Sequence, residues 1–94
     1  MMSEERKAKV AGRLRRIEGQ IRGIIGMVEQ GRYCMDMLSQ TAAAVAALRG
    51  VEDLIMKSHV ESCVAEALRS GDDAGRRMKI DEVIQAIGRV RRHG

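Results

Sequence analysis

The sequence predicts an all-α protein, and three observations support this fold class. The chain of 94 residues contains no Pro, Phe or Trp and a single aromatic residue, Tyr33, whereas β-sheets depend on aromatic and β-branched residues. Residue types compatible with helices, such as Ala, Leu, Ile, Met, Arg and Glu, are abundant. Apolar residues also recur at steps of three and four positions through long stretches. Because 45% of the residues are apolar, the chain is not a disordered tail, and we expect residues 1–94 to form one domain.

Helix one is expected over about residues 4–30, where apolar side chains form one stripe of an amphipathic helix. Ser3 is placed to cap its start, and Gly31 is placed to end it. The stripe consists of Val10, Leu14, Ile17, Ile21, Ile24, Ile25 and Val28. Glycines lower the stability of a helix, so their number here suggests that a neighbouring helix approaches closely. These glycines are Gly12, Gly19, Gly23 and Gly26.

Two further helices are expected. Helix two covers about residues 33–69, which contain no Pro and a single glycine, Gly50. The Gly-Asp-Asp sequence at 71–73 is expected to break it. Helix three is expected over about residues 77–92, where the apolar residues at helical spacing are Ile80, Val83, Ile84, Ile87 and Val90.

The size of the chain predicts a homo-oligomer. A chain of this length buries only about 60–65% of its unfolded surface, and two long helices with a short third cannot close a core alone. Two cysteines without a recognisable signal peptide argue against a disulfide scaffold. No apolar run approaches the roughly 20 residues of a membrane span. We therefore expect a cytoplasmic helical oligomer with no membrane segment.

The charge is segregated along the chain, which predicts a polyanionic partner. Residues 1–32 contain eight Lys or Arg against four Asp or Glu, and residues 76–94 contain six against two. Residues 33–75 reverse the balance, with three basic and seven acidic side chains. Basic surfaces attract nucleic acid, and the lack of aromatic residues disfavours single strands, whose bases stack on aromatic rings. Duplex DNA is the partner that we expect; an anionic membrane surface is a competitor without the usual Trp or Phe anchors.

Two cysteines and a histidine have the chemistry of a site for a soft metal ion. His59 and Cys63 are four residues apart and share one helix face, while Cys34 begins the same expected helix. The 25 positions between Cys34 and His59 span about 37 Å of helix, so one straight helix cannot bring all three to one ion. Two antiparallel copies can, since Cys34 of one chain then meets the pair of the other. Thiolates select Cu(I) or Zn, and three ligands favour Cu(I), although such residues are more often ordinary packing or surface positions.

The spacing along helix two fits such a pairing of two chains. A walk in alternating steps of four and three from Cys34 reaches His59 through mostly apolar positions, as in a heptad seam. The intermediate positions are Leu38, Thr41, Val45, Leu48, Glu52 and Ile55. Its midpoint falls near Leu48, which would lie close to a two-fold axis.

These residues resemble the copper-sensing repressors of the copper-sensitive operon, a family with nickel/cobalt-sensing and formaldehyde-sensing relatives. The likeness covers the run from Arg13 to Ile24, Arg32-Tyr33-Cys34, Leu48, and the run from His59 to Cys63. The resemblance implies an all-helical dimer of dimers in which two long helices of each chain form an antiparallel four-helix bundle. It also implies that the protein binds operator DNA without a helix-turn-helix.

The resemblance further assigns roles to residues of this chain. It implies that Cu(I) binds Cys34, His59 and Cys63 in trigonal geometry across the dimer interface and weakens DNA binding, so that copper-export genes are derepressed. Tyr33 and Glu82 match the outer-shell pair of the family's site. The positions that match or neighbour its DNA-contacting arginines are Arg13, Arg15, Arg16 and Arg49.

Several alternatives stay open beside a copper sensor. The absence of any His before His59 disfavours a nickel or cobalt site, which needs more nitrogen ligands. A thiol-based formaldehyde or redox sensor on the same scaffold would respond through Cys34 and tolerate the loss of Cys63. A nucleoid-type DNA binder would need neither cysteine. An enzyme with Cys34 as nucleophile and His59 as base is not expected, because so short a chain offers no substrate pocket and helix length separates the two.

Overall fold

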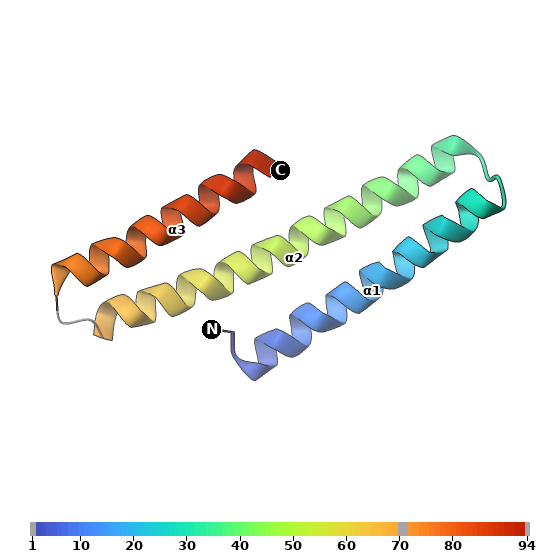
Figure 1. Ribbon diagram of the computed structural model, residues 1–94. Helices are drawn as coiled ribbons and strands as arrows, with labels where there is room; N and C mark the ends of the chain where they lie inside the picture. Colours follow the sequence, from blue (N-terminus) through green and yellow to red (C-terminus); the bar gives the residue numbers. More distant parts are fainter. Residues whose placement is uncertain (1, 70–71, 94) are drawn as a thin grey trace.

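The protein is a single layer of three helices. The computed structural model describes residues 2–69 and 72–93, with side chains as far as residue 89. Helices α1 (Glu4–Glu29) and α3 (Asp73–His93) both pack against the long central helix α2 (Cys34–Arg69), and each runs antiparallel to it (Figure 1). No strand occurs among the described residues. The all-α prediction is therefore confirmed.

The layer is long and thin. Its extents are 60 × 28 × 13 Å, and the smallest is close to the diameter of one helix with its side chains, about 10–12 Å. The radius of gyration is 18.0 Å, whereas a compact domain of this length has about 12 Å. One chain therefore has no second layer to bury the apolar faces of its helices.

Both predicted caps of α1 are present. The Ser3 side chain accepts a hydrogen bond from the backbone N–H of Arg6 at 3.1 Å. After the helix, the N–H of Gly31 donates to the Val28 carbonyl at 3.1 Å and the N–H of Arg32 to the Met27 carbonyl at 3.0 Å. This is the pattern of a Schellman motif, which needs a left-handed residue at its turn. Gly31, with φ of 66°, supplies that conformation.

Gly31→Ala is expected to lower the free energy of unfolding by about 1–2 kcal/mol, because a β-carbon disfavours the left-handed conformation. The matched control is Gly26→Ala, a helical position where a new β-carbon meets nothing within 4 Å and helix propensity improves by up to about 1 kcal/mol. Chemical denaturation of both variants at one protein concentration measures the difference. Equal effects of the two substitutions would contradict the role assigned to Gly31.

The glycines of α1 were expected to allow close approach of a neighbouring helix, but the structure shows open space around them. Close approach by a neighbouring helix does not occur within the described chain, because a β-carbon at any of four positions would meet no atom within 4 Å. These positions are Gly12, Gly19, Gly23 and Gly26. The reason is that α1 touches only α2 and directs its glycines elsewhere.

Helix α3 begins at Asp73, four residues before the expected start at 77. The expectation treated Asp73 as part of a break, but Asp72 Oδ1 accepts the backbone N–H of Gly75 at 2.6 Å and so caps a helix that includes Asp73. An acidic residue in the first turn also favours the helix dipole. The predicted breaker Gly71 and the side chain of Val90 lie outside the described residues.

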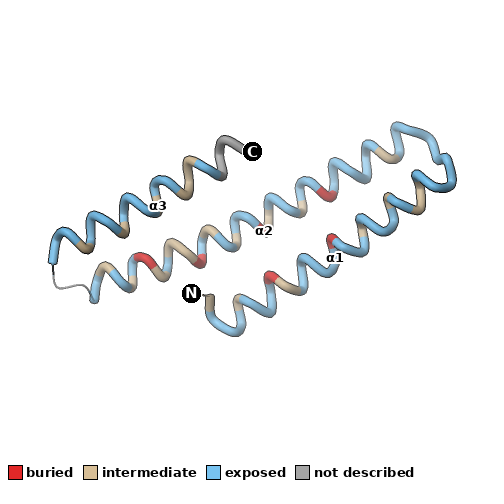
Figure 2. The backbone as a smooth tube through the Cα atoms, in the orientation of Figure 1, coloured by how far each residue is buried: buried red, intermediate tan, exposed pale blue. Residues whose placement is uncertain are grey.

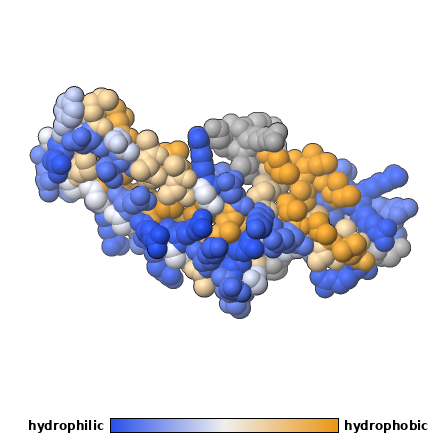
Figure 3. Space-filling model, turned by 180° about the vertical axis from the view of Figure 1, so that it is seen from behind, coloured by the Kyte–Doolittle hydropathy of each residue, from blue (hydrophilic) through white to orange (hydrophobic). Residues whose placement is uncertain are grey.

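The buried core is small and lies between α1 and α2. Its main cluster consists of Val10, Ile17 and Val51, with Met2, Ala47 and Leu54 packed against it, and Ala44 and Cys63 of α2 are buried outside this cluster. Figure 2 shows how few positions on α1 and α2 are buried, and none of residues 73–89 of α3 is buried. Large hydrophobic side chains remain exposed on every helix, and Figure 3 shows them gathered over the half of the molecule where α3 lies on α2. So much exposed apolar surface is typical of a chain that packs against a partner.

Candidate functional site

Helix α2 separates the three predicted metal ligands within one chain. Cys34 is its first residue and is exposed, whereas His59 and Cys63 lie near its other end. The helix is continuous from Cys34 to Arg69, so the predicted separation of about 37 Å between Cys34 and His59 holds. In the part of the chain that the structure describes, no group of three His, Cys, Asp or Glu side chains could hold a metal ion. One chain therefore places the predicted ligand residues in two separate positions.

The Cys63 thiol faces α3. Its side chain is buried, and Sγ donates a hydrogen bond to the backbone carbonyl oxygen of Lys79 at 3.0 Å. An apolar cavity of about 240 Å³ adjoins it, lined by residues of α2 and α3 that include Val60, Val64, Ile80 and Ile84. The thiol thus has a defined partner and an apolar surrounding.

The structure brings Glu82 of α3 close to His59 of α2. Glu82 Oε1 lies 3.8 Å from Nε2 of His59, an ion-pair distance that exceeds that of a direct hydrogen bond. Both side chains line a cavity of about 330 Å³ between α2 and α3. Tyr33, the other predicted outer-shell residue, is 69% exposed and precedes α2 at its opposite end. Within one chain it does not join Glu82.

Lys79 is a residue of this region that sequence reasoning missed. Its Nζ lies 2.8 Å from Glu66 Oε2 on α2 and 3.8 Å from Glu82 Oε2 on its own helix. The hydrogen bond and charge of Lys79 lower the pKa of Glu66, and those of Glu66 raise the pKa of Lys79. The spacing of three residues between Lys79 and Glu82 was a usable signal for their contact, but the pairing with Glu66 depends on how α3 lies on α2.

Glu66→Gln is expected to lower the free energy of unfolding most near neutral pH. A carboxyl group whose pKa is lowered in the folded state stabilises the fold at a pH above its unfolded pKa, and this stabilisation is lost as the pH falls through the folded pKa. A lysine whose pKa is raised in the folded state stabilises the fold at a pH below its unfolded pKa, and this stabilisation is lost as the pH rises through the folded pKa. The pair with Lys79 therefore acts only between these limits, and its partial exposure keeps the effect small. Denaturation curves across acidic, neutral and alkaline pH measure it, with Asp53→Asn, at an exposed carboxyl on the same helix, as control. A pH-independent difference would contradict the ion pair.

The predicted DNA-binding arginines lie on two adjacent helices. Arg13 and Arg16 of α1 line a cavity of about 300 Å³ together with Gln20 of α1 and Ala47 and Gly50 of α2. A β-carbon on Gly50 would lie 3.8 Å from Nη1 of Arg13, so the Arg13 guanidinium rests against α2 at its glycine. The other two predicted residues, Arg15 and Arg49, are exposed, and Arg49 directly precedes Gly50.

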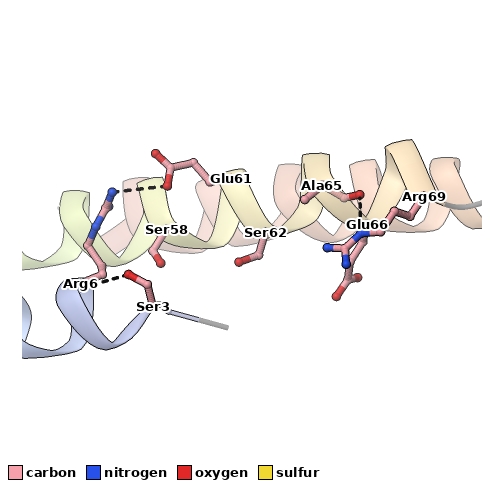
Figure 4. A pocket seen from close by; sticks show the side chains of 8 residues that line it. All are labelled: Ser3, Arg6, Ser58, Glu61, Ser62, Ala65, Glu66 and Arg69. Atoms are coloured by element: carbon pink, nitrogen blue, oxygen red, sulfur yellow. Dashed lines mark hydrogen bonds and ion pairs between the residues drawn. The ribbon is translucent and has the colours of Figure 1, made fainter.

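Arg6 also belongs to the basic segment, but it connects α1 to α2. Its guanidinium donates to the Leu54 carbonyl at 3.4 Å and pairs with Glu61 Oε2 at 3.3 Å. It lines a cavity of about 460 Å³, which Figure 4 shows between the start of α1 and the far part of α2. Glu66 lies along the same cavity. The composition of this segment alone could not distinguish Arg6 from arginines that are available to DNA.

Comparison with known proteins identifies the class of regulatory protein to which this helical layer belongs. Residues 6–89 match the family described as metal-sensitive transcriptional repressor, and the chain belongs to this family. Its members are repressors and not enzymes, which agrees with the sequence expectation. No described helix is long and apolar enough to cross a bilayer.

Two curated relatives are named as copper sensors. The chain is 47% identical over 70 residues to the copper-sensing transcriptional repressor CsoR of Bacillus subtilis, a match that covers 74% of this chain and 69% of that protein. It is 41% identical over 86 residues to the copper-sensing transcriptional repressor RicR of Mycobacterium tuberculosis, covering 92% and 88% respectively.

Solved structures share the fold. The copper-sensing repressor CsoR with Cu(I) from Geobacillus thermodenitrificans matches with a TM-score of 0.80 and 37% identity, covering 95% of this chain and 90% of that one. The nickel-responsive transcriptional regulator InrS matches with a TM-score of 0.79 and 36% identity, covering 88% and 90%. The fold of this chain is therefore shared by a copper-sensing repressor and by a nickel-responsive transcriptional regulator.

Proposed function

We propose that this chain is a Cu(I)-responsive transcriptional repressor whose metal-free form binds operator DNA and whose Cu(I)-bound form releases it, so that copper-export genes are expressed. The observation that supports this most directly is the continuous helix α2, with one thiol at its start and an imidazole–thiol pair near its end. Its relatives named as copper sensors support the same assignment.

The donor set fits Cu(I). Cys34, His59 and Cys63 offer two sulfur atoms and one nitrogen, a soft set that suits this ion better than harder metals. Glu82 lies at Nε2 of His59, which leaves Nδ1 as the ring nitrogen for a metal, in keeping with the usual carboxylate–histidine arrangement. Bound Cu(I) would supply a single centre that joins residues of two chains. Tyr33 would then stand beside the site as the neighbour of Cys34.

A second copy of the chain would complete this ligand set. Several apolar positions of the heptad walk along α2 are exposed in the single chain, and they are Leu38, Val45, Leu48 and Ile55. An antiparallel partner helix on this face would bury them and place Cys34 of one chain near His59 and Cys63 of the other. The proposed assembly is a four-helix-bundle dimer, paired into a dimer of dimers.

The basic face of α1 would hold duplex DNA. Arg13, Arg15 and Arg16 would supply charge from α1, and Arg49, which precedes Gly50 on α2, would add to it. Guanidinium groups bind phosphates in fork geometry, and such binding weakens steeply with salt. A repressor of this kind acts in the cytoplasm, where the operator is.

The two sites would communicate through the contact between α2 and α3. Cys63 would bind the metal as a thiolate and release its proton to solvent, so that its Sγ would no longer donate a hydrogen bond to the Lys79 carbonyl. Metal binding would thereby break the hydrogen bond that joins α2 to α3 beside the metal site. Coupling of this kind typically changes the affinity for DNA by about 5–150-fold.

An anaerobic Cu(I) titration tests the function. The probe is a duplex that the metal-free protein selects from a random library, and a gel shift measures DNA binding at each copper concentration. We expect release at about one copper per chain, since two identical chains form two identical sites. Release by formaldehyde or an oxidant through the exposed Cys34, without release by copper, would favour the thiol sensor instead. Release by nickel alone would overturn the copper assignment.

A further inference from the structure

We propose that Lys79 is a positioning residue that holds the Glu82 carboxylate toward His59 and thereby links the metal site to helix α3. The inference rests on the proposed function for its consequence, the coupling of metal to DNA. Its structural part, the orientation of Glu82, concerns the metal-free chain alone.

The two carboxylate oxygens of Glu82 have different neighbours. Oε2 lies 3.8 Å from Nζ of Lys79, and Oε1 lies 3.8 Å from Nε2 of His59. A carboxylate whose one oxygen is held by a cation presents the other in a defined direction. Glu82 is half-exposed, so without such a cation its side chain would sample several rotamers in solvent. Lys79 thus restricts where the oxygen that faces His59 can lie.

Lys79 is itself anchored on α2. Its ammonium group lies 2.8 Å from Glu66 Oε2, closer than it lies to Glu82, and this pairing crosses from α3 to α2. Each group stabilises the charged form of the other, as the lowered pKa of Glu66 and the raised pKa of Lys79 indicate. The ammonium therefore has a fixed position from which to hold Glu82.

The backbone of the same residue contacts the other ligand region. The Lys79 carbonyl accepts a hydrogen bond from the Cys63 thiol at 3.0 Å, so Lys79 contacts one proposed ligand directly. Its contact with the other proposed ligand, His59, is indirect and runs through Glu82. A structural change at either Cys63 or His59 consequently alters the contacts of one residue of α3, Lys79. The ordinary alternative is that Lys79 and Glu66 only attach the two helices to each other, because exposed ion pairs add little beyond this.

The deciding experiment uses Lys79→Met, with Lys79→Arg as the conservative variant. NMR of the metal-free protein at one pH records the imidazole nitrogen and proton signals of His59, which the variant His93→Gln separates from the only other histidine. We expect Lys79→Met to shift the His59 signals and Lys79→Arg to leave them near the wild-type positions. The matched control is Lys7→Met, which removes a lysine that pairs with Glu4 at 3.1 Å on α1.

The second readout is the factor by which Cu(I) weakens DNA binding. We expect Lys79→Met to reduce this factor about threefold to fivefold, a part of the usual coupling range, while Lys79→Arg and Lys7→Met leave it unchanged. Unshifted His59 signals in Lys79→Met would overturn the proposal, as would failure of Lys79→Arg to restore them or an equal shift in Lys7→Met. A wild-type protein that ignores copper would overturn the proposed function, and the metal-free spectra would still decide the role of Lys79.

Discussion

Cys63→Ser is expected to abolish the response to Cu(I) while leaving DNA binding by the metal-free protein intact. Serine keeps a hydroxyl donor for the Lys79 carbonyl, 3.0 Å from the present sulfur, so the contact between α2 and α3 survives. Its oxygen is a hard, poor ligand for Cu(I). The factor by which copper weakens DNA binding, about 5–150-fold in coupled systems, should fall to about one. Gel-shift titration with and without Cu(I) measures both quantities.

The companion variant Cys34→Ser separates the two sensor classes. A copper sensor needs both thiols, so both variants should lose the response. A formaldehyde or redox sensor that works through the exposed Cys34 would lose its response only in Cys34→Ser. A Cys63→Ser protein that still releases DNA with copper would show that Cys63 is not a ligand.

Arg13→Ala is expected to weaken DNA binding while copper affinity stays near the wild-type value. Arg13 lines the cavity at Gly50 on α2, away from His59 and Cys63 near the far end of that helix. Loss of one phosphate contact should lower the slope of log affinity against log salt by about one for each chain that touches the duplex. Gel shifts over a range of salt concentrations, with a Cu(I) competition titration, give both values.

The control for Arg13 is Arg22→Ala, which removes the same charge from the same helix. Arg22 pairs with Glu18 at 3.7 Å, so less of its charge is available to DNA, and we expect a smaller change in the salt slope. Equal losses in the two variants would indicate a general effect of net charge. A large copper defect in Arg13→Ala would contradict the separation of the two sites.

Much of the fold could be predicted from local patterns. Apolar spacing and the absence of proline indicated the long helices, and both caps of α1 followed from residue type, since Ser3 accepts a backbone N–H and Gly31 takes a left-handed conformation. The start of α3 was placed four residues late, because Asp72 could be read equally as a breaker or as a cap. Only the contact with Gly75 distinguishes these two roles of an aspartate.

Part of the candidate site could likewise be predicted from the sequence, and part could not. The chemistry of Cys34, His59 and Cys63, and their separation along one helix, could be stated from the sequence because helix geometry is regular. The resemblance gave Glu82 as one of an outer-shell pair, and its position 3.8 Å from His59 is visible only in the structure. The positions of Lys79 and Arg6 could not be derived, since a basic residue type does not reveal whether its charge is already paired.

By itself the sequence determined which segments are helical, which side chains have the chemistry to bind a soft metal or a phosphate, and that the helices of one chain cannot close a core alone. Only the tertiary structure decided that the Cys63 thiol meets the Lys79 carbonyl and that Lys79 stands between Glu66 and Glu82. The physical reason is that periodicity defines the face of each helix but not the register between two helices. That register depends on how their side chains interdigitate.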